Sequence, residues 1–147
     1  MAEFSIHEAA KAEHADVAAF YTECGYMSGF GASDTVLVAE LKGSIVGVAR
    51  LCPDQGVVVL RGMQVHPDFK RQGIGQSLLN NCMARVGTSQ CYCIPWRHLE
   101  RFYASAGFEH CDTSAVPVFL SARYSRYLKD ELDVILMRYP SKFRGNS

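Results

Sequence analysis

Hydrophobic and polar positions follow two different periods along this chain, and those periods predict its main elements. Apolar residues recur at helical spacing over residues 13–24 and again over residues 73–86. Residues 35–41, 44–51 and 57–65 are instead strand-sized runs with many β-branched side chains. The pattern therefore predicts two amphipathic helices and three consecutive strands.

The connections between these runs predict how the strands pair. Lys42-Gly43 and the segment from Pro53 to Gly56 are typical of tight turns, so the three strands are expected to run antiparallel. Gly62 interrupts the third strand, where a glycine often marks a bulge or the close approach of another backbone. The helix over residues 73–86 then returns the chain to a strand that should run parallel to the third.

Weaker patterns predict the remaining elements. We expect strands over residues 4–7, 90–94 and 133–139, an extended piece from Phe108, a short helix lined by Leu99, Phe102, Tyr103 and Ala106, and a weak helix over residues 121–129. The tail from about Pro140 is expected to be flexible.

These elements predict an α+β fold, an α/β sandwich with a mixed, mainly antiparallel central sheet and helices on both faces. The length of 147 residues, with no repeat and no linker, predicts a single domain over residues 1–147.

Composition narrows the class of protein and of partner. Hydrophobic residues make up 48% of the chain and charged residues 20%, and fifteen basic residues balance fifteen acidic ones. A chain without net charge has no global field that would draw it onto nucleic acid or an anionic membrane, so we expect neither partner. No apolar run is long enough to span a bilayer, and the N-terminus lacks the pattern of a secretory signal. The six cysteines include no Cys-x-x-Cys pair, so we expect reduced thiols, no metal and a cytoplasmic location.

The segment from Met63 to Gly75 is the most informative part of the sequence. A strand runs into a short basic loop containing Lys70 and Arg71, two glycines two positions apart follow, and a helix begins. Backbone N–H groups and the positive end of the helix dipole then point into one small space, which suits a phosphate group. Because the neighbouring strand offers a second, linear hydrogen-bonding surface, we expect a long ligand with a phosphorylated end.

Two familiar phosphate-binding loops do not fit this segment. Gln76-Ser77 follows Gly75 where a nucleoside-triphosphate P-loop requires Lys and then Ser or Thr. Leu78 stands where a dinucleotide-binding fingerprint requires a third glycine or an alanine. A glycine pair before a helix is by itself only a turn, so the surrounding residues decide the interpretation.

Two segments, in the family's order and at its usual separation, resemble motifs of the GNAT superfamily of acyl-CoA N-acyltransferases. The acetyl-CoA-binding motif is matched by Val65-x-Pro67-x-x-Lys70-x-Gln72-Gly73-Ile74-Gly75-x-x-Leu78-Leu79. The second motif is matched by Leu99-x-x-Phe102-Tyr103-x-x-x-Gly107-Phe108. The chain departs from the family pattern at Lys70, where the family usually has Arg or Gln, and at Trp96, where the second motif often has an Asn.

The resemblance implies that the strand and the loop bind acetyl-CoA as a cosubstrate. The strand edge at Met63, Gln64 and Val65 would pair with the pantetheine amides, and the Val65 N–H would donate to the thioester carbonyl. Tyr103 would be the general acid that protonates the departing thiolate. The diphosphate would be held by loop N–H groups, with a charged contact from Lys70 or Arg71, over the residues Lys70, Arg71, Gln72, Gly73, Ile74, Gly75 and Gln76.

The implied activity is N-acetyl transfer from acetyl-CoA to a primary amine by direct attack in a ternary complex, because no Cys–His pairing suggests an acyl-enzyme. The sequence leaves the general base open among His66, His98, Glu40, Asp34 and Glu23. It also leaves open the acceptor amine, the formation of a homodimer, and an alternative function as a non-catalytic acyl-CoA-binding sensor or regulatory module.

Overall fold

The computed structural model describes residues 3–26 and 29–140 of the chain. Its strands are β1 (Ser5–Glu8), β2 (Thr35–Leu41), β3 (Ser44–Asp54), β4 (Val57–Val65), β5 (Cys91–Cys93), β6 (Glu109–His110) and β7 (Met137–Tyr139). Its α-helices are α1 (His14–Glu23), α2 (Ile74–Val86), α3 (Glu100–Ala104) and α4 (Val118–Lys129). Short 3-10 helices are η1 (Lys11–Glu13), η2 (Pro67–Phe69), η3 (Arg97–Leu99) and η4 (Thr113–Ala115).

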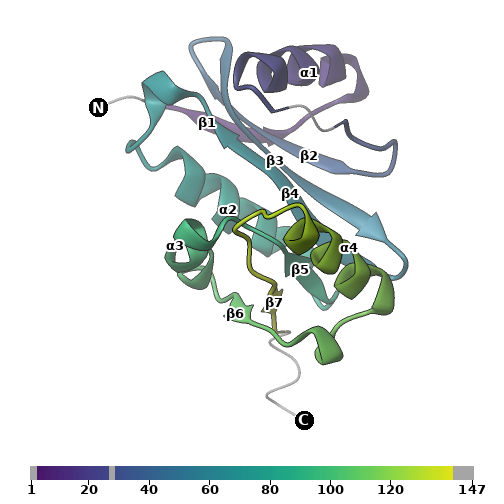
Figure 1. Ribbon diagram of the computed structural model, residues 1–147. Helices are drawn as coiled ribbons and strands as arrows, with labels where there is room; N and C mark the ends of the chain where they lie inside the picture. Colours follow the sequence, from purple (N-terminus) through teal and green to yellow (C-terminus); the bar gives the residue numbers. More distant parts are fainter. Residues whose placement is uncertain (1–2, 27–28, 141–147) are drawn as a thin grey trace.

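The strands form one seven-stranded sheet in the order β1-β2-β3-β4-β5-β7-β6. Strands β1 to β4 run antiparallel to their neighbours, as the tight turns predict. Strand β5 lies parallel to β4 after the crossover through α2, and β7 is antiparallel to both β5 and β6. The prediction of a mixed, mainly antiparallel α+β sheet is therefore confirmed (Figure 1).

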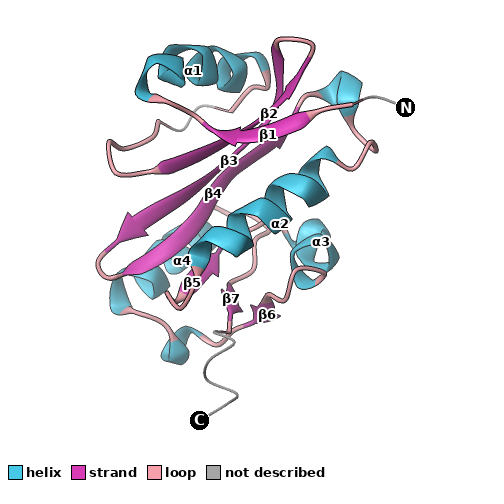
Figure 2. Cartoon of the chain, turned by 180° about the vertical axis from the view of Figure 1, so that it is seen from behind, coloured by secondary structure: helices cyan, strands magenta, loops and turns pink. Residues whose placement is uncertain are grey.

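Helices cover both faces of the sheet, and the side-chain alternation of β2 shows how. Val36 and Val38 belong to a core cluster with α1, whereas Leu37 and Ala39 belong to one with α2. Tyr103 of α3 joins the α2 cluster, so α2 and α3 share a face of the sheet. Figure 2, the reverse of the view in Figure 1, has this face toward the reader. The apolar stripe predicted for residues 73–86 is the buried side of α2.

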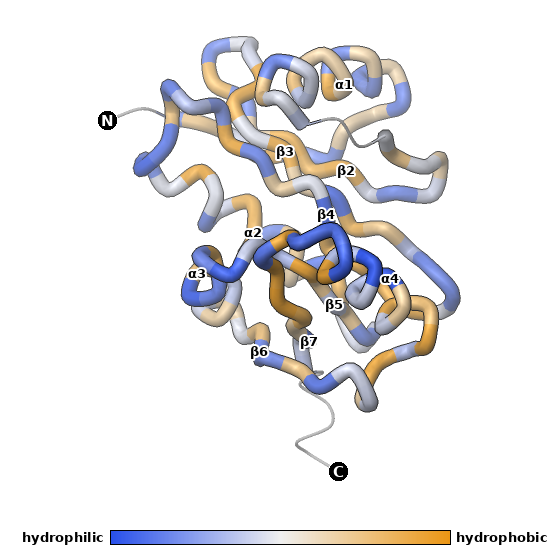
Figure 3. The backbone as a smooth tube through the Cα atoms, viewed as in Figure 1, coloured by the Kyte–Doolittle hydropathy of each residue, from blue (hydrophilic) through white to orange (hydrophobic). Residues whose placement is uncertain are grey.

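Helix α4 lies on the face that α1 occupies. Its Leu120 packs in one cluster with Val57 and Val59 of β4, and Val59 is paired with Cys52 of β3. Figure 1 accordingly shows α1 and α4 over different halves of the sheet, with the middle of β4 between them. The hydrophobic colouring of Figure 3 is strongest along the chain that enters β7, where residues 134–137 are buried.

The structure corrects three boundaries. The strand predicted over residues 133–139 is wrong in its first half: β7 begins at Met137, whereas Val134 makes an isolated bridge to Trp96. Strand β3 continues through the predicted turn to Asp54, because Gln55 and Gly56, both with positive φ, make the turn alone. Helix α4 begins at Val118, three residues before the weak helix that the sequence predicts. The flexible tail predicted from about Pro140 falls, beyond that residue, outside the described part of the chain.

All six cysteines are free thiols, and Cys52, Cys82, Cys91 and Cys93 are buried. Within residues 3–26 and 29–140, no helix combines the length and the apolar character that crossing a bilayer would need.

Candidate active site

The sheet opens between β4 and β5. These strands pair only at their beginnings, Val58 with Cys91 and Val59 with Tyr92. Beyond that point β4 keeps β3 on one edge, while its other edge borders a cleft of about 890 Å³. The cleft extends from the N-terminus of α2, past α3, to α4. The long hydrogen-bonding edge that the sequence predicts is therefore exposed to a cavity.

A bulge in β4 is built at Gly62. The β3–β4 register shifts between Val48 and Arg50, opposite this glycine, which has φ of +66°. The Tyr21 hydroxyl donates to the Gly62 carbonyl at 2.8 Å, and a Cβ at position 62 would collide with this hydroxyl and lie 2.8 Å from Arg50 Nε. Glycine is therefore required here both for its backbone angle and for space.

The register of β4 turns the Val65 amide toward the cleft. His66 N donates to the Val46 carbonyl at 2.9 Å, whereas Val65 itself is opposite Gly47. In an antiparallel ladder the N–H groups of successive residues point to opposite edges, so the Val65 N–H points away from β3. Met63, two residues earlier, borders the cleft on the same edge.

The N-terminus of α2 offers unpaired donors to the other end of the cleft. Ser77 N donates the first intrahelical bond, to the Gly73 carbonyl at 3.0 Å, so the N–H groups of residues 74–76 precede the ladder. Gly73 has no side chain to cap them, and its φ of +82° together with the φ of +67° at Arg71 bends the loop into the helix. This end of the cleft has the donor set expected of an anion site.

The structure brings almost all of the predicted site residues together. Gln72 is exposed and does not border the cleft. The residues that do border it are Met63, Gln64, Val65, Lys70, Arg71, Gly73, Ile74, Gly75, Gln76 and Tyr103.

Tyr103 is buried in the wall of the cleft, on α3. It is 6% exposed, and the rings of Phe102 and Phe108 meet it edge-on at centroid distances of 5.0 and 6.0 Å. Burial raises the pKa of its phenol well above the ordinary value near 10. The side chain therefore keeps its proton at neutral pH, and its hydroxyl has no hydrogen-bond partner among the described residues.

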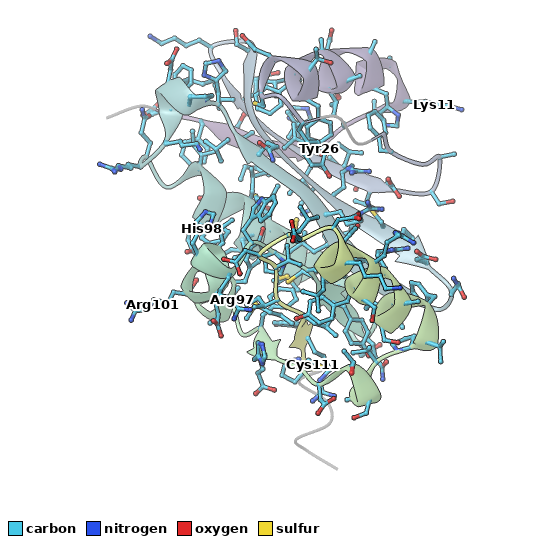
Figure 4. The ribbon with its side chains drawn as sticks, in the orientation of Figure 1. Lys11, Tyr26, Arg97, His98, Arg101 and Cys111 are labelled. Atoms are coloured by element: carbon cyan, nitrogen blue, oxygen red, sulfur yellow. The ribbon has the colours of Figure 1, made fainter. Side chains whose placement is uncertain are left out.

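Of the five residues considered as general base, His98 alone borders the cleft; Figure 4 shows it beside Arg97, just before α3. His66 is engaged elsewhere, because its Nδ1 accepts from Asp68 N at 3.1 Å and its Nε2 lies 3.5 Å from a Glu23 carboxylate oxygen. Asp34 binds a buried arginine, and Glu40 lies on β2 away from the cleft.

That buried arginine, Arg50, is a feature that the sequence analysis missed. Its side chain is 1% exposed, and it donates to Asp34 Oδ2 at 3.0 Å and to the Tyr21 hydroxyl at 3.1 Å. It also donates to the Gly29 carbonyl at 3.1 Å and to the Tyr26 hydroxyl at 3.3 Å. Arg50 thus ties the loop after α1 to the bulge of β4. A charge inside the otherwise apolar run of residues 45–52 was the available signal.

Comparison with known proteins agrees with this geometry. A family model described as an acetyltransferase (GNAT) domain matches residues 32–110, more than half of the chain. No curated protein sequence matches the chain significantly.

Solved structures of GNAT proteins share the fold at low sequence identity. One is the N-acetylglutamate synthase of Neisseria gonorrhoeae complexed with coenzyme A and N-acetyl-glutamate (TM-score 0.71, 18% identity); the match covers 94% of this chain, which spans only 35% of the synthase. Another is the ribosomal-protein-S18-alanine N-acetyltransferase of Escherichia coli (TM-score 0.70, 15% identity, 95% of this chain and 94% of that one). A third is a GNAT family acetyltransferase of Brucella melitensis in complex with acetyl-CoA (TM-score 0.58, 18% identity, 74% and 84%).

The residues that the family model matches, 32–110, include the open edge of β4, the glycine loop and the start of α2. The chain belongs to the GNAT acetyltransferase family, a family of acyl-CoA-dependent enzymes.

Proposed function

We propose that this chain, as a single domain, transfers an acetyl group from acetyl-CoA to a primary amine by direct attack in a ternary complex. One observation carries the proposal: the free edge of β4 and the uncapped N-terminus of α2 border the same cleft. The strand edge offers main-chain donors and acceptors to the pantetheine arm, and the helix N-terminus offers N–H groups to the diphosphate.

The cosubstrate is assigned along these two features. The N–H groups of Gly73 to Gln76 receive the diphosphate, with Lys70 and Arg71 as the neighbouring cations. Met63 and Val65 offer their free backbone edge to the pantetheine amides, with Gln64 between them on β4. Gln72 does not border the cleft, so its contribution to binding the diphosphate comes from its backbone in the loop and not from its side chain.

The transfer step needs three groups. The neutral amine attacks the thioester carbonyl carbon, and the Val65 N–H donates to the oxygen as it becomes negative. When the C–S bond breaks, the electron pair stays on sulfur and Tyr103 supplies the proton that converts the thiolate into a thiol. The new amide nitrogen loses its extra proton to a base, for which His98 is the candidate that borders the cleft. Tyr103 regains its proton from solvent.

A covalent acyl-enzyme is disfavoured by the cysteines. Cys93 is the cysteine that borders the cleft among the described residues, and burial raises the pKa of its thiol well above the ordinary value. A buried thiol that keeps its proton is a poor nucleophile. Direct attack by the amine is therefore the simpler route.

The test begins with CoA binding, measured by thermal shift, and continues with release of free thiol from acetyl-CoA across a panel of amines. Amino acids and peptides with a free N-terminus belong in the panel, since one similar structure contains N-acetyl-glutamate and another protein is named for the alanine it acetylates. Thiol release that depends on an amine supports the proposal. CoA binding without transfer to any amine would favour the non-catalytic acyl-CoA-binding module instead. A homodimer and a cytoplasmic location stay predictions.

A further inference from the structure

The half of the cleft beyond the bulge of β4 is lined by arginine and tyrosine. Arg61 comes from β4, and Arg123 and Tyr127 come from α4. Tyr26, on the loop after α1 (Figure 4), also borders the cleft. Among the described residues that border the cleft, none is Asp or Glu. A cationic amine would therefore meet positive charge here and no carboxylate.

Arg61 carries a charge that no carboxylate of the described residues neutralises. Its side chain shares the sheet face of Val59 and lies directly across from Arg50 in the β3–β4 register. Asp34 pairs with Arg50 at 3.0 Å, which neutralises that member of the arginine pair. Arg61 has no ion pair or side-chain hydrogen bond within residues 3–26 and 29–140. One positive charge is thus left over on this face.

Arg123 has a partner for one of its terminal guanidinium nitrogens and none for the other among the described residues. Its Nη2 lies 2.9 Å from Asp54 Oδ2, and its guanidinium stacks over the Phe119 ring at 5.4 Å. Its Nη1 is buried and has no hydrogen-bond partner in the described part of the chain. A buried guanidinium nitrogen without an acceptor is costly, so the surroundings of Arg123 leave part of its hydrogen-bonding capacity unused.

These arginines are too far from the glycine loop to serve the diphosphate. Gly75 lies beside Val65, since a Cβ at position 75 would be 3.6 Å from Val65 Cγ2. Arg61 is four residues before Val65, about 13 Å along the strand at 3.3 Å per residue. The edge of β4 at Met63 to Val65, where the pantetheine arm and the thioester are placed, lies between the two basic regions. Arg61 therefore faces the acceptor and not the phosphates.

We propose that the acceptor amine carries a carboxylate, which Arg61 binds as its main partner, with Arg123 as a second arginine bordering the same cleft. This inference rests on the proposed function of the same cleft and names the substrate class as amino acids, in preference to polyamines or aminoglycosides. A single unneutralised cation matches a single negative charge, because the charges of Arg50 and Arg123 are already balanced by Asp34 and Asp54. A planar guanidinium fits a carboxylate through two parallel hydrogen bonds.

The test compares pairs of ligands that differ only in the carboxylate. N-acetyl amino acids, which resemble the acetylated product, are titrated against their carboxamides by calorimetry, both with saturating CoA and without it. We expect the acids to bind at least about tenfold more tightly than the amides, the effect of one charge-assisted contact. In the variant Arg61→Gln we expect acids and amides to bind about equally. The control variant Arg101→Gln should keep the preference, because Arg101 is exposed and points to solvent from α3 (Figure 4).

Each outcome decides the question. Equal binding of acids and amides, absence of binding by both, or a preference that survives in Arg61→Gln would overturn the carboxylate assignment. None of these results depends on turnover. CoA binding and thiol release with carboxylate-free amines test the proposed transfer separately. An active enzyme that shows no preference for the carboxylate would contradict this inference but not the proposed function.

Discussion

Tyr103 is the side chain whose environment best matches a proposed chemical task. A general acid for a thiolate must hold its proton until the C–S bond breaks. Burial against Phe102 and Phe108 holds that proton by disfavouring the phenolate. The hydroxyl has no partner among the described residues, which leaves it free to meet a ligand in the cleft.

The variant Tyr103→Phe should lower kcat by about 10²-fold, within the range for loss of one general acid. The Michaelis constant for acetyl-CoA should change little, because the ring and its packing are kept. Steady-state thiol release at varied acetyl-CoA measures both quantities. An unchanged kcat, in a variant whose melting temperature equals that of the parent chain, would remove Tyr103 from the chemistry.

The same burial makes a prediction about pH. Since the phenol pKa is higher in the folded chain than in the unfolded one, the folded state holds the proton where the unfolded state releases it. The stability contributed by a protonated Tyr103 is complete below about pH 10 and is lost as the pH rises above it. Denaturation by urea should therefore show Tyr103→Phe losing less stability than the parent between pH 9.5 and about pH 11. An identical alkaline loss in both chains would contradict a buried phenol.

At the scale of elements, a set of hydrogen bonds holds the bulge of β4 in shape. The Tyr21 hydroxyl donates to the Gly62 carbonyl and accepts from Arg50 Nε, so one atom of α1 joins β3 and β4. This linkage fixes where the free edge of β4 begins. It is a positioning device, since neither Tyr21 nor Arg50 borders the cleft.

The variant Tyr21→Phe should lower the free energy of unfolding by about 1–3 kcal/mol, because it leaves a carbonyl and a charged donor without their partner. Urea denaturation measures the loss. Tyr124→Phe is a matched control, since that hydroxyl has no hydrogen bond among the described residues while its ring also packs against the core. If both variants lose the same stability, the hydroxyl at position 21 does not hold the bulge.

The loop before α2 allows folding and binding to be separated with two glycines. Gly73 and Gly56 both have φ above +80°, and a Cβ would meet nothing within 4 Å at either position. Alanine should therefore cost each site a similar amount of stability, about 1–2 kcal/mol for the left-handed backbone. Only Gly73→Ala should weaken CoA binding, by roughly tenfold, because only position 73 orients the donors of residues 74–76. Calorimetry that finds the same CoA affinity in both variants would dissociate this loop from the diphosphate.

The elements that the sequence predicted well are those whose signal is local. The residue patterns predict the strand over residues 57–65 and the helix after Gly73, and Gly62 is predicted to mark a bulge or a close backbone approach, of which the structure shows the bulge. The strand predicted from Asp133 failed in its first half because its backbone bonds go to a loop far away in sequence, with Ile135 N donating to the Pro95 carbonyl. Separation in sequence also explains why the ion pairs of Arg50 and Arg123 were not predicted. Arg50 meets Asp34, and Arg123 meets Asp54, only once the sheet has formed.

At the scale of the whole molecule, the cleft lies between two parts of one sheet. Strands β4 and β5 meet at Val58 and Val59 alone, and α2 packs across both sides in the same core cluster as Cys91 and Cys93. A ligand that fills the opening would contact β4 on one side and the region of α3 on the other. Its binding free energy would then be added to the stability of the whole fold.

CoA at 100 times its dissociation constant should therefore stabilise the chain by about 2.7 kcal/mol, seen as a rise in melting temperature. Hydrogen exchange should locate the effect. CoA is expected to slow exchange at the amides of residues 63–65 and of residues 73–76, because it spans the strand edge and the helix N-terminus. ADP, which retains the diphosphate and lacks the pantetheine arm, should protect the second group and leave the first exchanging freely. If CoA protects neither group while the melting temperature still rises, the ligand binds elsewhere, and the open edge of β4 is not the acyl-CoA site.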